Sequence, residues 1–225
     1  MKILNLFVDH NKQDSFVNRL RKKRFYRIQL EIEKLIAEKG NIKILDIGGE
    51  MAYWKNMGWQ DARCSIYLLN LETVERPDPL PGFFHVTGNA LNMSYTPGEF
   101  DLVFSNSVIE HVGSPENQQL FANEVRRLSD HYIIQTPSLW FPLEPHSVLP
   151  LFQFIPHSLR AYLIMWFNIN YFPKAKTYKE AVAVSRTTLM LTKAGFKKLF
   201  PEAEIQTEYL FGIPKSYTAI KGRSQ

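Results

Sequence analysis

The chain has 225 residues and 45% of them are hydrophobic, which is enough for one α/β domain with an insertion and a buried core. A single cysteine, Cys64, excludes an internal disulfide and a cysteine-rich zinc site, and no metal site is expected. No apolar run reaches the roughly 18–20 residues of a membrane-spanning helix. Residues 1–8 are too short for a signal peptide, so we expect a cytoplasmic protein.

The net charge of +5 has a local origin near the amino terminus. A run of basic residues without any acid comprises Arg19, Arg21, Lys22, Lys23, Arg24 and Arg27. It lies in a segment with helical spacing, residues 15–39, which Gly40 ends. The predicted apolar face contains Phe16, Leu20, Phe25, Ile28, Ile32, Leu35 and Ile36. The basic side chains form either a solvated helix face or a contact with an acidic substrate, an anionic lipid surface or nucleic acid.

The most informative stretch follows this helix. Residues 42–47 form an apolar run that contains Asp46 and is followed by Gly48 and Gly49. Such a run predicts a buried parallel strand, and a glycine pair lets the backbone turn sharply and approach a ligand closely. A short helix is expected over residues 51–57. Ligands bind to open α/β sheets at the carboxyl ends of the strands, so this turn is a candidate binding site.

Further strands are predicted over residues 64–69, 83–87, 100–104 and 131–135, with a helix over residues 115–128 before the last of them. Polar or small residues follow three of these strands: Asn70, Glu72, Asn89, Ala90, Ser105 and Asn106. In nucleoside-binding sheets, an acid after the second strand accepts hydrogen bonds from ribose hydroxyls. Glu72 is therefore the preferred candidate for that role.

The region after the fifth strand has a different composition. Residues 139–183 form an insertion that is rich in aromatic residues and prolines, and residues 159–167 within it are expected to be helical. We then expect a helix over residues 187–194 that Gly195 ends. Two terminal strands, over residues 203–211 and 217–220, are predicted to pair antiparallel around a turn at residues 212–216.

Several of these stretches resemble motifs of the class I S-adenosylmethionine-dependent methyltransferases. The run Ile44-Leu45-Asp46-Ile47-Gly48 resembles the family's first motif, and Gly88-Asn89-Ala90-Leu91 its Gly-Asp-Ala motif. Residues 100–112, which read FDLVFSNSVIEHV, closely resemble the fourth motif. Residues 124–128 match the helix before the fifth strand, and residues 188–196 resemble the family's leucine and Ala-Gly-Phe ending. The resemblance covers residues 41–221 and is closest to the type 11-like subgroup.

This resemblance implies a Rossmann-like α/β fold with a doubly wound seven-stranded sheet, mostly parallel with a terminal antiparallel strand. The whole chain, residues 1–225, would be one methyltransferase domain with a leading basic helix in residues 1–40 and an inserted lid at residues 139–183. The implied cofactor is S-adenosylmethionine. The residues implied to bind it are Asp46, Gly48, Gly49, Asn70, Glu72, Asn89, Ala90, Ser105 and Asn106.

Two positions depart from the family pattern. Glu50 and Ala52 stand where later glycines of a Gly-x-Gly-x-Gly run are usual, so side chains are expected to narrow the passage for the cofactor's methionine part. Asn89 stands where aspartate is common, although its carbonyl can still accept a hydrogen bond from the adenine amino group. The first departure leaves open a degenerate methyltransferase-fold binding protein without turnover.

Methyl transfer is an in-line displacement, and an oxygen nucleophile also needs a base. The candidates are His111, Glu144 and His146. His111 either lies at the rim of the cofactor cleft or ties down a loop. Glu144 and His146 flank a proline in the loop after the fifth strand, where His146 serves either as a base or in a capped turn.

The acceptor implied by the resemblance is a small molecule, a lipid or a glycan, methylated at oxygen. The aromatic insertion is a lid over an apolar acceptor, additional core, or an edge in peripheral contact with a membrane. Nucleic acid is disfavoured because the chain lacks an Asn/Asp-Pro-Pro-aromatic motif. A nicotinamide dehydrogenase is also disfavoured, because the turn after the first strand does not read Gly-x-Gly-x-x-Gly.

Overall fold

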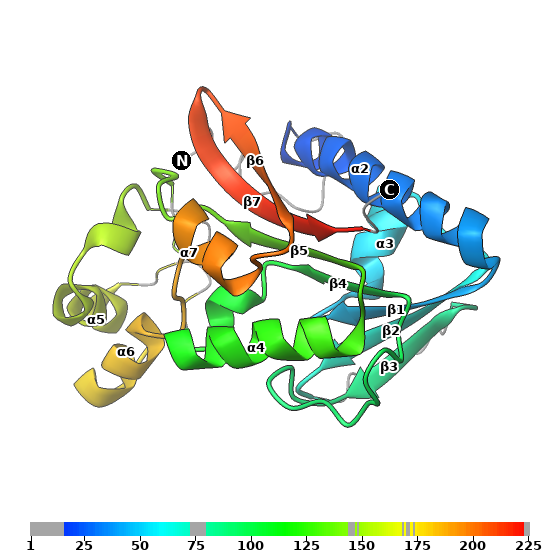
Figure 1. The fold of residues 1–225 in the computed structure, drawn as a ribbon. Helices are drawn as coiled ribbons and strands as arrows, with labels where there is room; N and C mark the ends of the chain where they lie inside the picture. Colours follow the sequence, from blue (N-terminus) through cyan, green and yellow to red (C-terminus); the bar gives the residue numbers. More distant parts are fainter. Residues whose placement is uncertain are drawn as a thin grey trace. The chain divides into compact units, whose positions relative to one another are not determined.

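The computed structural model describes residues 16–72, 80–143, 147, 149–167, 169, 172 and 174–222. Seven strands form one sheet in the order β3-β2-β1-β4-β5-β7-β6 (Figure 1). This confirms the predicted α/β class with a mostly parallel seven-stranded sheet. The described residues divide into two compact units, one drawn from residues 1–106, 120–134 and 220–225, the other from residues 107–119 and 135–219.

The first unit contains the part of the sheet around β1. Its elements are α2 (Phe16–Lys39), β1 (Ile42–Ile47), α3 (Met51–Met57), β2 (Cys64–Asn70), β3 (Phe83–Thr87), β4 (Leu102–Asn106), the larger, second part of α4 (Pro115–Leu128), the first residues of β5 (Tyr132–Pro137) and the end of β7 (Ile213–Lys221). β1 pairs in parallel with both β2 and β4. The chain therefore proceeds from β1 to β2 and β3 on one side, and returns to the other side of β1 with β4. The strand order reverses at this point, which is where open α/β sheets bind their ligands.

The apolar face predicted for the leading helix forms much of this unit's core. Phe25, Ile28, Ile32, Leu35 and Ile36 are each at most 5% exposed and belong to one cluster with side chains of β1, α3, β2 and β4. The side chains of Phe16 and Leu20 lie outside the described residues. The predicted helix boundaries and the inward face are therefore confirmed over the described side chains.

Trp54 on α3 is fully buried at the centre of this core. Its ring contacts those of Phe25, Trp59, Phe83 and Phe104, with centroids between 5.2 and 6.3 Å apart. Aromatic pairs at such separations add to the stabilisation from burial. One side chain therefore joins α2, α3, β3 and β4.

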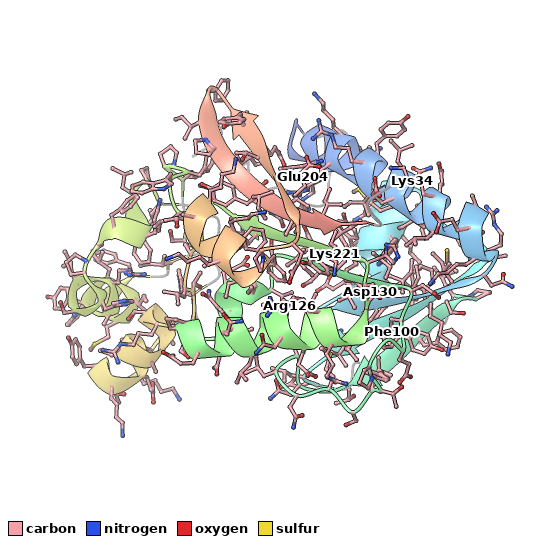
Figure 2. The ribbon with its side chains drawn as sticks, viewed as in Figure 1. Lys34, Phe100, Arg126, Asp130, Glu204 and Lys221 are labelled. Carbon is pink, nitrogen blue, oxygen red and sulfur yellow. The ribbon has the colours of Figure 1, made fainter. Side chains whose placement is uncertain are left out.

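Residues 220–222, distant in sequence, complete the same unit. Ile220 packs against its apolar core. Lys221, labelled with Asp130 in Figure 2, places its Nζ 4.0 Å from the Asp130 carboxylate and 6.0 Å from the centroid of the Tyr132 ring. The first unit is therefore formed by residues that precede residues 135–219 of the second unit and by residues that follow them.

Some strand boundaries differ from the prediction. We expected a strand over residues 100–104, but β4 runs from Leu102 to Asn106. Asp101 explains the shift, because its carboxylate accepts a hydrogen bond from the Lys43 N–H at 2.8 Å and pairs with Lys39. The Asp101 side chain thereby holds the residues directly before β4 against the start of β1. β5 (Tyr132–Pro137) similarly begins one residue and ends two residues later than expected.

The second unit contains η1 (Ile109–His111), the first half of α4, the last residues of β5, η2 (Phe152–Phe154), α5 (His157–Trp166), α6 (Tyr178–Ser185), α7 (Lys193–Leu199), β6 (Glu204–Leu210) and most of β7 (Ile213–Lys221). Phe152, Ala161, Ile164 and Ala181 form the centre of a separate apolar cluster in which α5 meets α6. This cluster gives the unit a core of its own.

The helix predicted over residues 187–194 is wrong. Leu189 lies outside any helix and its N–H donates to the Glu110 carbonyl at 2.7 Å. α7 begins only after Thr192, whose hydroxyl accepts a hydrogen bond from the Gly195 N–H at 3.1 Å. Gly195 therefore lies in the first turn, where the threonine cap requires its N–H, and does not end the helix.

The terminal turn is also shorter than predicted. Phe211 and Gly212 have φ angles of +51° and +77°, the pattern of a two-residue type I′ hairpin turn. β7 consequently begins at Ile213 and includes Pro214, which we had assigned to the turn. β6 and β7 run in opposite directions (Figure 1).

Phe25→Ala should destabilise the first unit by about 3–5 kcal/mol, because it removes a buried ring that joins α2 to α3. Chemical denaturation of parent and variant measures this difference. Tyr26→Ala is the matched control, since Tyr26 is 60% exposed on the same helix, and it should change stability by less than about 0.5 kcal/mol. Equal effects of the two substitutions would show that the aromatic contacts do not hold α2.

Candidate functional site

The turn after β1 is fixed from two sides. Gly48 has φ +70° and its N–H donates to the Leu69 carbonyl at 2.7 Å. A Cβ on Gly49 would lie 2.2 Å from the Asp46 carboxyl, so this position has no room for a side chain. The Asn70 amide donates to the Gly49 carbonyl at 3.0 Å. Both glycines are therefore required, one for its backbone conformation and the other for its packing.

A cavity of about 340 Å³ opens beside this turn, at the carboxyl ends of β1 and β4. Its size lies within the range of small-molecule pockets. All of the residues that line it belong to the first unit: Arg21, Asp46, Gly48, Gly49, Glu50, Ala52, Tyr53, Asn56, Met57, Phe104 and Asn106. The position follows from the reversal of strand order between β1 and β4.

Asp46 is the most perturbed acid of this cavity. It is 2% exposed, and its carboxylate accepts a hydrogen bond from the Trp54 indole N–H at 2.8 Å. Burial raises the pKa of Asp46 to about 8, the indole hydrogen bond partly offsets this, and the charge of Glu50 raises it further. Near neutral pH this carboxyl therefore holds its proton for much of the time.

Tyr53 forms part of the cavity wall. Its ring stacks on Phe104 with centroids 5.8 Å apart, and its hydroxyl is buried with no hydrogen-bond partner among the described residues. Burial raises the pKa of Tyr53 to about 12, although the nearby charges of Arg24 and Arg21 lower it. The phenol therefore keeps its proton at neutral pH and can donate a hydrogen bond.

Two of the remaining lining residues carry charge. Arg21 comes from α2, and Glu50 is the residue before α3, with an exposed side chain that makes no capping hydrogen bond. Glu50 and Ala52 were expected to narrow the passage, yet they line a cavity that retains about 340 Å³. With Asp46 included, the cavity is lined by one guanidinium, from Arg21, and two carboxyl groups, from Asp46 and Glu50.

The structure distributes the predicted cofactor residues over three groups. Four of them, Asp46, Gly48, Gly49 and Asn106, line the cavity. Two others have partners within the protein: Asn70 holds the glycine turn, and the buried Ser105 hydroxyl donates to the Ile47 carbonyl at 3.0 Å. These two hydrogen bonds position the backbone around the cavity.

The remaining predicted cofactor residues follow β2 and β3. Glu72 is exposed, two residues beyond the end of β2. The Asn89 side-chain carbonyl accepts a hydrogen bond from the Leu91 N–H at 2.9 Å, which forms a local turn next to the half-buried Ala90. None of the three lines the cavity.

Of the three candidate bases, the structure describes only His111. His111 is exposed at the end of η1 in the second unit. The neighbouring Glu110 is buried and accepts a hydrogen bond from the Thr136 hydroxyl at 3.0 Å, so this part of the fourth motif joins η1 to β5. Glu144 and His146 lie outside the described residues.

Sequence reasoning missed several lining residues. It placed Arg21 in a basic helix but did not assign it to the site, and it gave no role to Tyr53, Asn56, Met57 or Phe104. For Arg21 a signal exists, because it precedes the apolar-face residue Phe25 by four positions and so shares its side of the helix. In the structure Arg21 lines the cavity, whereas Lys22 and Lys23 beside it are exposed.

Residues 47–130 match the family model described as a methyltransferase domain. This segment of the chain is similar to the S-adenosylmethionine-dependent methyltransferases. The match spans the glycine turn, the segment after β3 and the fourth motif, so the predicted recognition of the family is confirmed. A comparison with functionally curated proteins gave no match.

Solved structures of other proteins are similar to this chain at low sequence identity. The carbon methyltransferase CurJ aligns with a TM-score of 0.56 at 10% identity, over 98% of this chain and 58% of its own. The PH0226 protein from Pyrococcus horikoshii OT3 aligns with a TM-score of 0.48 at 15% identity, over 100% of this chain and 99% of its own. A protein from Nostoc punctiforme PCC 73102, provisionally assigned as an O-methyltransferase, aligns with a TM-score of 0.45 at 15% identity, over 84% and 54%. The chain thus spans little more than half the length of two of these three.

The cavity residues fit the cofactor of this family. S-adenosylmethionine carries a sulfonium, an ammonium and a carboxylate, and the cavity offers carboxyl groups from Asp46 and Glu50 with a guanidinium from Arg21. Gly48 and Gly49 keep the backbone free of side chains where it borders the cavity. Among the described residues there is no cluster of side chains that could hold a metal ion, and no helix is long and apolar enough to cross a membrane.

The raised pKa of Asp46 predicts a pH-dependent stability. The unfolded chain loses this proton near pH 4 but the folded protein keeps it until about pH 8. Stability should therefore fall as pH rises between these values, by up to about 1.4 kcal/mol per pH unit. Urea unfolding at pH 5, 7 and 9 should show this fall for the parent relative to Asp46→Asn, whose side chain does not titrate. Parallel pH profiles for the two proteins would contradict the raised pKa.

Proposed function

We propose that this methyltransferase binds S-adenosylmethionine in the cavity of the first unit and transfers the cofactor's methyl group to a small-molecule acceptor. The observation that carries the proposal is the cavity itself. It lies where the strand order reverses beside β1, borders a turn of two required glycines, and contains charges of both signs. The family match over residues 47–130 supports the same reading.

The cofactor supplies a methyl group on a sulfonium, and the protein's contribution is position. Glu50 attracts the cationic end of the ligand, Asp46 does the same once it has lost its proton, and the Trp54 hydrogen bond keeps the Asp46 carboxyl in one orientation. Asn70 and Ser105 act as positioning residues, because they hold the Gly49 and Ile47 backbone that borders the cavity. Alignment of the nucleophile with the methyl group then accounts for most of the rate.

We extend the proposal to the ribose and adenine parts of the cofactor. Glu72 is exposed beyond β2, and a carboxylate there accepts from two ribose hydroxyls with charge-assisted bonds. Asn89 and Ala90 follow β3 and are proposed for the adenine. The Asn89 carbonyl has a second lone pair beyond the one that the Leu91 N–H uses, so its local turn leaves it able to accept from the adenine amino group.

The acceptor is proposed to contain an apolar or ring-bearing part, as in a lipid or a glycan, and to be methylated at oxygen. The exposed large apolar side chains of the second unit include several that are between 47% and 63% exposed, among them Trp140, Phe154, Leu159, Tyr162, Trp166 and Phe167. Such exposure is unusual for a protein surface without a partner and suits an apolar ligand or peripheral contact with lipid. The proposed base for an oxygen acceptor is His146, His111 or Glu144; a base variant should lose turnover at unchanged cofactor affinity.

Gly48→Val should lower the affinity for S-adenosylhomocysteine by at least about tenfold, because its branched Cβ occupies the space where the backbone approaches the ligand. Isothermal titration calorimetry measures the affinity. Gly58→Val is the matched control, since Gly58 has a nearly identical φ of +68° but does not line the cavity. The control should lose a similar amount of stability and bind like the parent. Unchanged binding by Gly48→Val would remove this turn from the cofactor site.

Turnover distinguishes the enzyme from a degenerate binding protein of the same fold. The parent, incubated with methyl-labelled S-adenosylmethionine and a small-molecule extract of its host, should transfer label to an acceptor, and Gly48→Val should not. Label in the organic phase identifies a lipid acceptor, and label in the aqueous phase a glycan or another polar one. Binding of S-adenosylhomocysteine without any transferred label would favour the binding protein.

A further inference from the structure

Helix α5 has apolar side chains on the face that points away from its core. Ala161 and Ile164 are buried where α5 packs on α6 (Figure 1). The opposite face presents three residues that are spaced three and four positions apart: Leu159, Tyr162 and Trp166. Each of them is at least 50% exposed, and the exposed Phe167 follows directly. A surface helix normally has polar residues there, so this outer apolar face, formed by these four side chains, indicates a partner.

Two further exposed rings are attached to the start of this helix. Trp140 and Phe154 are both exposed, and their ring centroids lie 5.9 Å apart. The Gln153 amide donates to the carbonyls of the residues before and after Trp140, at 3.1 and 2.7 Å. The Arg160 guanidinium donates to the Ile155 carbonyl at 2.8 Å, which ties α5 to the end of η2. The exposed aromatic side chains therefore belong to one hydrogen-bonded scaffold.

The same part of the chain is strongly basic. Residues 151–200 contain eight lysines and arginines but one acid, Glu180, which is a larger excess than the net charge of +5 of the whole chain. Lys174, Lys176 and Lys179 are exposed on α6 and on the segment that leads into it, and α6 packs on α5. The Glu180 carboxylate is engaged locally, because it accepts a hydrogen bond from the Lys176 N–H at 2.9 Å. The surroundings of α5 are therefore positively charged.

These charges discriminate between the partners that an apolar face can have. A second copy of the chain would bring two positively charged surfaces together, which is unfavourable. Protein interfaces are depleted of lysine, whereas lysines accompany the outer apolar face. An anionic bilayer suits both features, since Trp and Tyr prefer the level of the headgroups and lysines are attracted to anionic lipid. With ten residues, α5 is too short to cross a bilayer but can lie in its interface.

We propose that α5 docks the protein on an anionic lipid surface, with its outer apolar face among the headgroups and the lysines around α6 against the lipid phosphates. The contact goes beyond the proposed function, because it requires neither the cofactor nor turnover. It assigns this face to the surface of a bilayer and not to a soluble apolar ligand. No covalent step is involved, since the attraction comes from burial of apolar side chains and from charge.

Sedimentation of the full chain with lipid vesicles tests the proposal. The parent should bind vesicles of phosphatidylcholine mixed with phosphatidylglycerol at least about tenfold more tightly than vesicles of phosphatidylcholine alone, and high salt should weaken this binding. A variant that combines Lys174→Gln, Lys176→Gln and Lys179→Gln should bind the mixed vesicles roughly 10- to 100-fold less tightly. Its binding to phosphatidylcholine alone should stay as in the parent.

Two tyrosines provide a matched pair for the apolar part of the contact. Tyr162→Ala, on the outer apolar face, should weaken binding to the mixed vesicles by about tenfold, because the ring no longer enters the headgroup region. Tyr209→Ala removes a ring of similar exposure from β6 and should bind like the parent. Both side chains are more than half exposed, so thermal unfolding should be nearly unchanged in either variant. Equal losses of binding would overturn α5 as the contact.

Three other results would also overturn the proposal. They are equal affinity of the parent for the two kinds of vesicle, no binding to either, and self-association without lipid that Tyr162→Ala abolishes in analytical ultracentrifugation. The last result would identify the outer apolar face as a contact between two copies of the chain. Calorimetry with S-adenosylhomocysteine keeps the proposed function separate, because the lysine variant should bind this ligand like the parent. Failure of the parent to bind it would contradict the proposed cofactor and leave the vesicle result standing.

Discussion

The hydrogen bond from the Trp54 indole to the Asp46 carboxyl is the interaction on which the rest of the first unit depends. It joins the end of β1 to α3 across the glycine pair, inside the buried core. Gly49 packs directly on that carboxyl, so the hydrogen bond also determines where the turn can run. Trp54 in turn contacts aromatic rings from α2, β3 and β4, and one side chain thereby links the polar floor of the cavity to the apolar core.

Burial of an acid beside a ligand cavity has a cost and a use. An isolated buried carboxylate is unfavourable, so Asp46 keeps its proton to a higher pH than a surface aspartate. A cationic ligand reverses this balance, because its charge favours the ionised form. Binding of the proposed cofactor would then be coupled to release of a proton from Asp46.

The fold was largely predictable because its signals are local. The strand–glycine–helix unit around Gly48 and the apolar face of α2 each follow from residue spacing, and the structure places them as expected. The errors arose where a tertiary contact overrides the local pattern. Asp101 moves the start of β4 by bonding to Lys43, and Thr192 requires the Gly195 N–H at the start of a helix rather than at its end.

The candidate site was predictable only in part, for a related reason. The first motif pointed to Asp46 and Gly48, which line the cavity, but Arg21 reaches the cavity through the packing of Phe25 on α3. Spacing alone cannot show that a basic side chain faces a cavity rather than solvent. Asn70 and Ser105 illustrate the converse: both stand at strand ends where ligands bind, yet their side chains hold the protein's own backbone.

The discontinuity of the first unit has a consequence for how the chain folds. Ile220 packs against the core cluster of the first unit, and Lys221 lies beside Asp130 and Tyr132, although residues 135–219 of the second unit separate Lys221 from Tyr132 in the sequence. Closing such a long loop carries an entropic cost, and folds rich in distant contacts form slowly. If the second unit orders first around its own cluster of Phe152, Ala161 and Ile164, the loop that remains is effectively much shorter. Early ordering of the second unit would thus lower the entropic cost of bringing Ile220 and Lys221 back to the first unit.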